Sequence, residues 1–474
     1  MRGRAVVGAL LVLALLARLA VLVTPLAGVS GDEAASALMA TNIRHGHGYV
    51  FFAGQSYMAS AVQYLQSLTL AIAPTSAFAL RLPDLVLSLA ACWLVHSVGL
   101  HVLRSRAAAL LALALYAVGP AFPLVYASRA SGAYNLALVL GLLALRVALA
   151  PEGGDRRALL LGVLTGAGLW CSPVSVFLTG PALLWRLPAL RADPRHCRPL
   201  ALGVVLGASP ALVWSLVHHR LGGLGAVTAA PAGSTPVSRL RGLLTDVLPE
   251  ELWLAWREGR PVVPSVLVAA VVGALLVAWA VAALRRRSAL TLLLTARAGA
   301  APADLVLVAA PLVVLLYAAS SYTWWTTEPR YLYLAGPWLV WGLAALAQRA
   351  RRPRAAGAVL VAATVGLSAL GLHAAGGVGR GTWRTDLVTA SRWLAAHDVP
   401  AAYADYRPAF TATFVTGGRE TVVPFDGQAC RFPGLARRAA TLTQGRPVVG
   451  WLLSSAHRVE LAPALRRAGV VDEL

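Results

Sequence analysis

Long runs of apolar residues, separated by short arginine-rich segments, dominate the pattern along the chain. A helix that crosses the hydrocarbon core of a bilayer needs about 20 apolar residues, and most of these runs approach that length. The pattern therefore predicts an all-α polytopic membrane protein. The runs occupy residues 5–27, 82–101, 107–125, 135–150, 158–185, 199–218, 263–284, 304–320, 331–348 and 355–372.

Arginine clusters between the runs indicate the orientation, because cytoplasmic loops carry an excess of basic residues. The run 158–185 has basic residues on both flanks, so it must cross the membrane an even number of times. We expect its helical break at Cys171-Ser172-Pro173, because proline disfavours helix in the residue before it. The prediction is about eleven spans, with the N-terminus cytoplasmic and the C-terminus outside.

This topology leaves residues 28–80, 126–134, 220–262 and 373–474 outside the membrane. The first segment has amphipathic stretches at 33–45 and 57–72 that are typical of helices lying along a membrane surface. The last alternates helices with strands, which is typical of a small α/β domain. Its expected helices are 384–397, 408–416 and 456–468, and its expected strands are 401–406, 421–425 and 447–453. We predict two domains: a transmembrane domain at 1–372, which includes the first outer loop at 28–80, and an extracytoplasmic α/β domain at 373–474.

Composition supports the membrane class. Of 474 residues, 58% are apolar and 13% are charged, whereas a soluble domain has about 25% charged residues. The net charge is +21, and all 41 basic residues are arginines, clustered between apolar runs. Nucleic-acid binding is disfavoured, because it needs a basic face on a soluble domain. The absence of lysine, with abundant alanine, glycine and leucine, favours a GC-rich bacterium and hence a bacterial cell membrane. The four cysteines have no metal-site or disulfide spacing.

Two adjacent carboxylates, Asp32 and Glu33, follow the first span directly. At the membrane boundary such a pair must be solvated, paired or metal-bound. One hypothesis makes Asp32 a helix cap, favoured by the helix dipole. The other makes the pair a functional site, and the residues alone leave both open.

Arginines at the outer ends of spans are exceptions to the positive-inside rule, by which basic residues concentrate in cytoplasmic loops. Arg81, Arg129 and Arg330 are such residues. Arginine binds phosphate through a bidentate fork, although a lone arginine also snorkels to the headgroup layer. Three of them near two carboxylates indicate an anionic lipid substrate. Arg18 lies inside the first span, so we expect it to face the bundle interior, with Asp84 or an outer-loop carboxylate as its partner.

The segment YTWWTTEPRYLY, residues 322–333, combines aromatic residues with Glu328 and Arg330. Its tryptophans, Trp324 and Trp325, fit an interfacial aromatic belt, which leaves the two charged residues without that explanation. His45 and His47 in a His-Gly-His-Gly loop are only a weak indication of a metal site.

Four segments resemble the GT-C membrane glycosyltransferases, and most closely their protein O-mannosyltransferase-like (family 39-type) bacterial branch. The resemblance covers most of the chain, but the matching residues are sparse. It is most specific at residues 31–83. The segments are GDEAASALMATNIRHGHGYVFFAGQSYMAS, ALRLPDLVLSLA, EPRYLYLAGPWL and YADYRPAFTATFVTGG.

The resemblance implies an enzyme that transfers one sugar, with inversion, from a polyprenyl-phosphate donor to a cell-envelope acceptor outside the membrane. The first-loop aspartate, here Asp32, is expected to act as general base or to orient the acceptor. The predicted catalytic residues are thus Asp32 and Glu33. The predicted substrate-binding residues are Arg81, Arg129, Tyr134, Glu328, Arg330, Tyr331, Asp405 and Tyr406.

This chain departs from its bacterial relatives at two places. They often carry a carboxylate near position 62 and another after the tyrosine of the RxxxxY turn, but here Val62 is apolar, and Asn135 and Leu136 follow Tyr134. A divalent metal is therefore possible rather than required, and no other cofactor is predicted. Two alternatives to an enzyme stay open: a non-catalytic protein that binds lipid-linked sugar on the same fold, and a transporter. The absence of internal repeats disfavours the transporter.

Overall fold

The computed structural model describes twelve stretches of the chain. The chain divides into two compact units. Unit 1 comprises Met1–Ala27, Ser56–Val62 and Pro83–Arg380, and unit 2 comprises Gly28–Gln55, Gln63–Leu82 and Gly381–Leu474. Unit 2 thus combines most of the first outer loop with the tail, and the predicted domain boundary at 372 stays a prediction. The described residues are 2–24, 28–119, 121–130, 132–150, 154–222, 233–252, 254–256, 260–323, 328–374, 383–425, 431–444 and 450–452.

Six of the described helices are long and apolar enough to cross a membrane. Six such helices are typical of a multi-pass membrane protein, which is the class that the apolar runs predict. Three shorter helices are also apolar, and the count of eleven spans stays a prediction. The six are Gly3–Val21, Ala77–Leu103, Pro173–Ala192, Pro194–His218, Ser265–Arg285 and Pro353–His373, and the shorter ones are Arg106–Val118, Tyr134–Leu149 and Asp304–Ala319.

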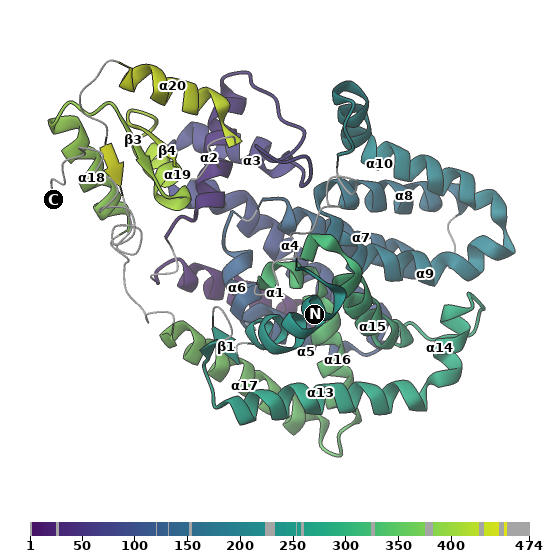
Figure 1. Ribbon diagram of the computed structural model, residues 1–474. Helices are drawn as coiled ribbons and strands as arrows, with labels where there is room; N and C mark the ends of the chain where they lie inside the picture. Colours follow the sequence, from purple (N-terminus) through teal and green to yellow (C-terminus); the bar gives the residue numbers. More distant parts are fainter. Residues whose placement is uncertain are drawn as a thin grey trace. The chain divides into compact units, whose positions relative to one another are not determined.

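Helices make up most of unit 1 (Figure 1). The break predicted near Pro173 is confirmed: α8 ends at Cys171 and α9 begins at Val176 after the short turn η2. The main helices are α1 (Arg2–Val21), α4 (Ala77–Leu103, which begins in unit 2), α5 (Arg106–Val118), α6 (Ala121–Ala127), α7 (Tyr134–Leu149), α8 (Gly154–Cys171), α9 (Val176–Ala192), α10 (Cys197–His218), α13 (Ser265–Arg285), α14 (Arg287–Leu294), α15 (Asp304–Ala319), α16 (Gly336–Arg349) and α17 (Pro353–Ala374). The shorter elements are η2 (Pro173–Ser175), η3 (Pro194–His196), α11 (Pro236–Gly242), η5 (Leu243–Val247), α12 (Leu248–Glu251), β1 (Ala255–Trp256), β2 (Arg260–Pro261), η6 (Ser321–Thr323), η7 (Pro329–Tyr331) and η8 (Tyr333–Ala335).

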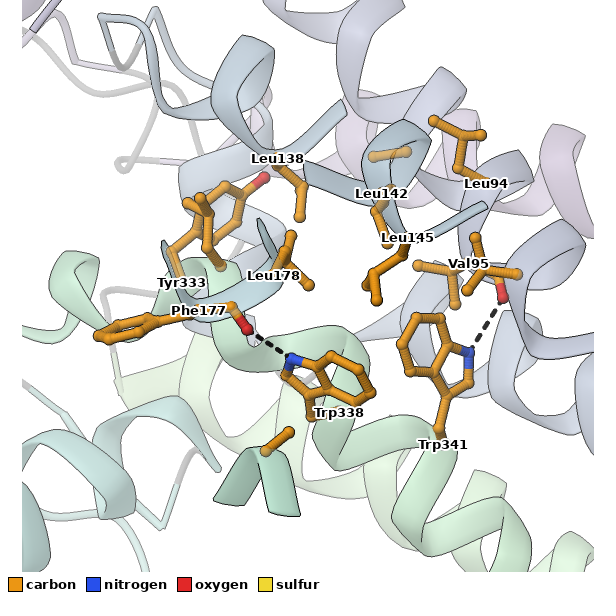
Figure 2. Close-up of a cluster of buried hydrophobic side chains, with 14 of the residues drawn as sticks. Leu94, Val95, Leu138, Leu142, Leu145, Phe177, Leu178, Tyr333, Trp338 and Trp341 are labelled. Carbon is orange, nitrogen blue, oxygen red and sulfur yellow. Dashed lines mark hydrogen bonds between the residues drawn. The ribbon is translucent and has the colours of Figure 1, made fainter. Parts of the chain in front are cut away.

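Two buried tryptophans on α16 anchor the core of unit 1 (Figure 2). Trp338 Nε1 donates to the Phe177 carbonyl at 2.8 Å, and Trp341 Nε1 donates to the Val95 carbonyl at 3.0 Å. A buried indole N–H needs such a partner. These bonds tie α16 to α9 and α4.

Arg18 faces the interior of unit 1, as predicted for a charge within a span. It is buried, and Nε donates to Ser88 Oγ at 2.9 Å while Nη2 donates to Cys92 Sγ at 3.2 Å. Its Nη1 reaches the carbonyls of Ala14 and Ala117. The predicted carboxylate partner is therefore wrong: polar atoms of α1, α4 and α5 satisfy the guanidinium.

Helices α8 and α10 pack against each other through glycines, and they lie side by side in Figure 1. Gly162 and Gly166 on α8 face Gly203 and Gly207 on α10. A Cβ atom at any of these four positions would lie 2.1 or 2.2 Å from a backbone carbonyl oxygen of the other helix. Glycines four residues apart permit such close approach of membrane helices.

We expect Gly166→Ala to destabilise the protein, because the added methyl would collide with the Val204 carbonyl and force the helices apart. Overpacking of this kind costs about 1–3 kcal/mol. Thermal unfolding of the detergent-solubilised protein measures the loss as a lower midpoint. Gly273→Ala on α13 is the matched control, because a Cβ there meets no atom within 4 Å and alanine favours helix. Equal midpoints for the two variants would contradict this packing.

Unit 2 contains a parallel sheet of three described strands in the order β4-β3-β5. Ala401 pairs with Thr421, and Ala402 pairs with both Val422 and Gly450. The described part of the tail contains helices and strands near the predicted positions, but the helix at 433–443 was not expected. The helix expected at 456–468 lies outside the described residues, and the α/β domain stays a prediction. The elements are α18 (Trp383–Ala396), β3 (Ala401–Ala404), α19 (Tyr406–Val415), β4 (Thr421–Pro424), α20 (Pro433–Thr443) and β5 (Gly450–Leu452).

The first outer loop forms two helices, α2 (Gly31–Arg44) and α3 (Ala61–Ile72). On α3 the polar side chains of Gln63 and Gln66 are fully buried, whereas Leu68 and Ile72 are 67% and 88% exposed. A helix with its polar face inward and its apolar face outward is suited to contact with lipid. The prediction that this helix lies along a membrane surface stays a prediction, and the exposure pattern supports it.

Candidate functional site

Ser30 caps the N-terminus of α2, and Glu33 completes the cap. Ser30 Oγ accepts from the backbone N–H of Glu33 at 3.2 Å, and Glu33 Oε2 accepts from the backbone N–H of Ser30 at 3.0 Å. These reciprocal bonds form a capping box. The hypothesis that Asp32 caps this helix is therefore wrong, because the helix begins at Gly31 and Ser30 occupies the cap position.

Glu33 and Arg81 form a buried ion pair within unit 2. Arg81 Nε donates to Oε1 at 2.7 Å and Nη2 donates to Oε2 at 3.0 Å, with side chains only 2% and 3% exposed for Glu33 and Arg81. Two parallel bonds hold both planar groups in one orientation. Since both oxygens of Glu33 are engaged, the geometry favours a structural role for this pair over the catalytic and phosphate-binding roles predicted for Glu33 and Arg81.

Asp32 has a different environment from Glu33. It lies in the first turn of α2, where the helix dipole stabilises a carboxylate. The Tyr406 hydroxyl donates to Asp32 Oδ1 at 2.8 Å, and Arg431 Nη2 lies 3.7 Å from the same oxygen. The Asp32 side chain is nevertheless 45% exposed. Of the two predicted catalytic carboxylates, Asp32 is the one that a substrate can reach.

A close approach of α19 to α2 brings Tyr406 to Asp32; the two helices lie side by side in Figure 1. A Cβ atom on Gly31 would lie 2.5 Å from Tyr406 Cε1 and 3.2 Å from the Cα of Arg407. Glycine at position 31 is therefore what allows the tyrosine ring to lie against the start of α2.

Arg431 is a site residue that sequence analysis missed. Its guanidinium lies 5.1 Å from the ring centre of Tyr406 and 5.4 Å from that of Phe52, within the range of cation–π attraction. Its Nη1 donates to the Ala53 carbonyl at 3.4 Å. One arginine among many in the tail carries no local signal, because its contacts are with residues far away in sequence.

Asp405 directly precedes α19 as its N-cap residue. Its backbone carbonyl accepts from the Ala409 N–H at 3.0 Å, and its side chain makes no capping bond. Its predicted role in substrate binding stays a prediction.

In unit 1, predicted site residues lie in a cluster of buried tyrosines. The hydroxyls of Tyr134 and Tyr322 are 2.8 Å apart. The Tyr322 ring contacts those of Tyr57 and Tyr331 at centroid distances of 5.4 and 5.1 Å. Burial raises the pKa of Tyr322 above its ordinary value. The structure thus brings together the RxxxxY turn and the YTWWTTEPRYLY segment, 188 residues apart.

Arg330 lies at the edge of this cluster. Its Nε is 3.8 Å from Glu328 Oε1, and its guanidinium is 5.6 Å from the Tyr331 ring centre. Arg129 lies in the turn that follows α6, and it is partly buried. Trp324 and Trp325, the predicted belt residues, lie outside the described residues.

Asn135 belongs to a second polar network in unit 1. It donates to Asp84 Oδ1 at 2.9 Å and accepts from the Tyr333 hydroxyl at 2.6 Å, and all three residues are buried. Because the amide both donates and accepts, it joins Asp84 to Tyr333.

Two further acidic residues, Glu250 and Glu251 on α12, are buried in unit 1, and sequence analysis missed both. Burial raises the pKa of Glu251 well above its ordinary value, and the neighbouring Glu250 raises it further. Over the described stretches, no group of three histidine, cysteine, aspartate or glutamate side chains is arranged to hold a metal ion. His45 and His47 are both exposed.

Comparison with solved structures identifies the fold. The apo crystal structure of ArnT from Cupriavidus metallidurans matches with a TM-score of 0.63 and 13% identity, over 98% of this chain and 95% of that chain. The structure of ArnT bound to undecaprenyl phosphate matches with a TM-score of 0.58 and 13% identity, over 96% and 94%. No protein-family model and no curated protein matches the sequence. The chain therefore shares the fold of ArnT over nearly its whole length, which agrees with the predicted resemblance.

Proposed function

We propose that this protein is a membrane glycosyltransferase that moves one sugar from a polyprenyl-phosphate donor to a cell-envelope acceptor. The fold shared with ArnT over nearly the whole chain supports this proposal, as does the undecaprenyl phosphate bound in one ArnT structure. Such a donor keeps its lipid tail in the bilayer, in keeping with the apolar helices of this chain. The reaction takes place at the outer face of a bacterial cell membrane. The protein crosses this membrane eleven times, with a cytoplasmic N-terminus and an extracytoplasmic tail.

The observation that carries the proposal is the half-exposed carboxylate of Asp32, held at the N-terminus of α2. Asp32 acts as the general base. It takes the proton of an acceptor hydroxyl, whose oxygen forms a new bond to the sugar C1. The bond from C1 to the phosphate oxygen breaks, and polyprenyl phosphate leaves with the bonding electron pair. Attack from the face opposite the leaving group inverts the anomeric configuration.

The departing phosphate needs cationic stabilisation. We assign this role to Arg330, because it lies beside Tyr331 at the edge of the tyrosine cluster, whereas Arg81 is engaged by Glu33. Tyr134 and Tyr331 would provide aromatic walls and hydroxyls beside the phosphate, and Glu328 would orient the Arg330 fork. Arg129, Asp405 and Tyr406 remain candidates for contact with substrate.

We expect Arg330→Lys to lower sugar transfer by about 10-fold, because lysine retains the charge but loses the bidentate fork. Transfer from a radiolabelled polyprenyl-phosphate-sugar to membrane acceptors measures the loss. Arg437→Lys on α20, an exposed arginine in unit 2, is the control with the same chemical change. A rate for Arg330→Lys equal to that of the control would remove Arg330 from the donor site.

A strain lacking the protein tests the function in the cell. Mass spectrometry of its envelope lipids, glycans and glycoproteins should show one sugar missing from one of them, restored by the wild-type chain but not by Asp32→Asn. An unchanged envelope would overturn the proposal. Restoration by Asp32→Asn would instead favour a non-catalytic binding protein on the same fold.

A further inference from the structure

The site around Asp32 contains two residues from the tail: Tyr406, whose hydroxyl donates to the proposed base, and Arg431, whose Nη2 lies 3.7 Å from the same oxygen. We propose that both are positioning residues: they hold the Asp32 carboxylate in one orientation, so that the base is assembled only when the tail is docked on α2. This inference rests on the proposed function, since it concerns how the same carboxylate is kept in place.

The tyrosine is fixed on three sides. Its hydroxyl donates to Asp32 Oδ1 at 2.8 Å, its ring makes a T-shaped contact with Phe410 at a centroid distance of 5.1 Å, and the missing side chain of Gly31 makes room for it. A fixed ring holds the hydroxyl oxygen at one position. The Asp32 side chain is therefore restrained at one oxygen although almost half of its surface is exposed.

The arginine is fixed just as firmly. The rings of Phe52 and Tyr406 lie near its guanidinium. With the Gln55 amide oriented so that its oxygen faces the arginine, Nη1 and Nη2 both donate to that oxygen at 3.2 Å. Gly54, at a φ of +73°, has room for no side chain here, because a Cβ would lie 2.8 Å from the Cα of Arg431. The first outer loop thus forms a slot for Arg431.

The arrangement separates two functions along α2. Glu33 is buried and engaged by Ser30 and Arg81, which anchors the start of the helix. Asp32, one residue earlier, is left accessible but is held from the tail by a hydroxyl and a nearby positive charge at 3.7 Å. A base that reacts once per cycle benefits from such restraint, because a misplacement of about 1 Å costs up to 10²-fold in rate.

Tyr406→Phe is the sharpest test, because it keeps the ring on Gly31 and removes only the hydroxyl. We expect kcat to fall about 10-fold, the usual effect of losing a hydrogen bond to a charged group, with the donor KM within about 2-fold of wild type. Tyr64→Phe is the matched control: it removes another hydrogen-bonded hydroxyl of unit 2, one that contacts the backbone of Tyr49. An unchanged kcat for Tyr406→Phe would overturn the role of the hydroxyl.

Arg431 is tested by a conservative pair of variants. Arg431→Lys keeps the charge and should retain most of kcat, whereas Arg431→Gln should lower kcat by about 5-fold or more. Thermal midpoints measured in parallel identify any loss caused by unfolding. Equal kcat values for the lysine and glutamine variants, at equal stability, would show that the charge beside Asp32 has no effect and would overturn this half of the inference.

A double-mutant cycle separates this inference from the proposed function. In the Asp32→Asn background, Tyr406→Phe should leave the residual rate within about 2-fold, because the group that it positions no longer acts as a base. An equal 10-fold loss in both backgrounds would contradict positioning through Asp32. If Asp32→Asn alone keeps the full rate, the proposed base fails; if it is inactive while Tyr406→Phe is normal, only the positioning role fails.

Discussion

Replacing Asp32 by asparagine is expected to reduce sugar transfer by about 10²–10⁴-fold, the usual contribution of a positioned general base. Asparagine has nearly the same shape, and its amide oxygen can still accept from the Tyr406 hydroxyl, which donates to Asp32 at 2.8 Å in the wild type. The capping box of Ser30 and Glu33 does not involve the Asp32 side chain. The variant should therefore fold normally and lose only the ability to take a proton.

Transfer from a labelled donor, at equal amounts of folded protein, measures this effect. Asp398→Asn is a suitable control, because Asp398 is exposed in the same unit and has a φ of +54° that asparagine tolerates well. Full activity of Asp32→Asn would remove Asp32 from the reaction. A loss of activity with an unchanged thermal midpoint is the result we expect.

Breaking the buried pair between Glu33 and Arg81 should have the largest effect on stability. Arg81→Met leaves the Glu33 carboxylate buried without its guanidinium partner, and removing one member of a buried pair costs about 3–5 kcal/mol. Both side chains are almost inaccessible, so water cannot replace the lost partner. We expect a strongly lowered thermal midpoint and a low yield of folded protein.

The double variant Glu33→Gln/Arg81→Met should recover much of that loss. It removes both charges, and glutamine still completes the capping box with Ser30. Arg195→Met is the control, because the ion pair of Arg195 with Asp193 is largely exposed, with the arginine side chain 78% accessible, and should leave the midpoint nearly unchanged. If Arg81→Met has the same thermal midpoint as Arg195→Met, the buried pair of Glu33 and Arg81 does not contribute to stability as proposed.

Periodicity and charge predicted the features that depend on local sequence. The break at Pro173 follows from the steric restriction that proline imposes, and the inward orientation of Arg18 follows from the cost of a charge in lipid. The strands β3, β4 and β5 lie where their apolar clusters predict, although helix α20 between β4 and β5 was not expected. Each of these features depends mainly on a few residues that are neighbours in the sequence. The sequence alone is therefore sufficient to predict them.

Contacts between residues that are far apart in the sequence could not be predicted from such local patterns. Whether Ser30 or Asp32 caps α2 depends on where the first turn begins, and assignments of this kind are uncertain by a residue or two. The pairing of Glu33 with Arg81 spans 48 positions, and that of Asp32 with Tyr406 spans 374. Sequence analysis named all four residues, but only the structure distinguishes the anchored carboxylate from the accessible one.

The most direct test of the account is turnover of a defined donor by the purified protein. Wild-type protein in detergent is mixed with a panel of polyprenyl-phosphate-sugars and an extract of envelope acceptors, and the release of polyprenyl phosphate is followed together with incorporation of the sugar. We expect that one donor is consumed, that its sugar appears on an acceptor in equal amount, and that Asp32→Asn lowers both rates by about 10²–10⁴-fold. Donor binding without release of polyprenyl phosphate from any member of the panel would contradict it.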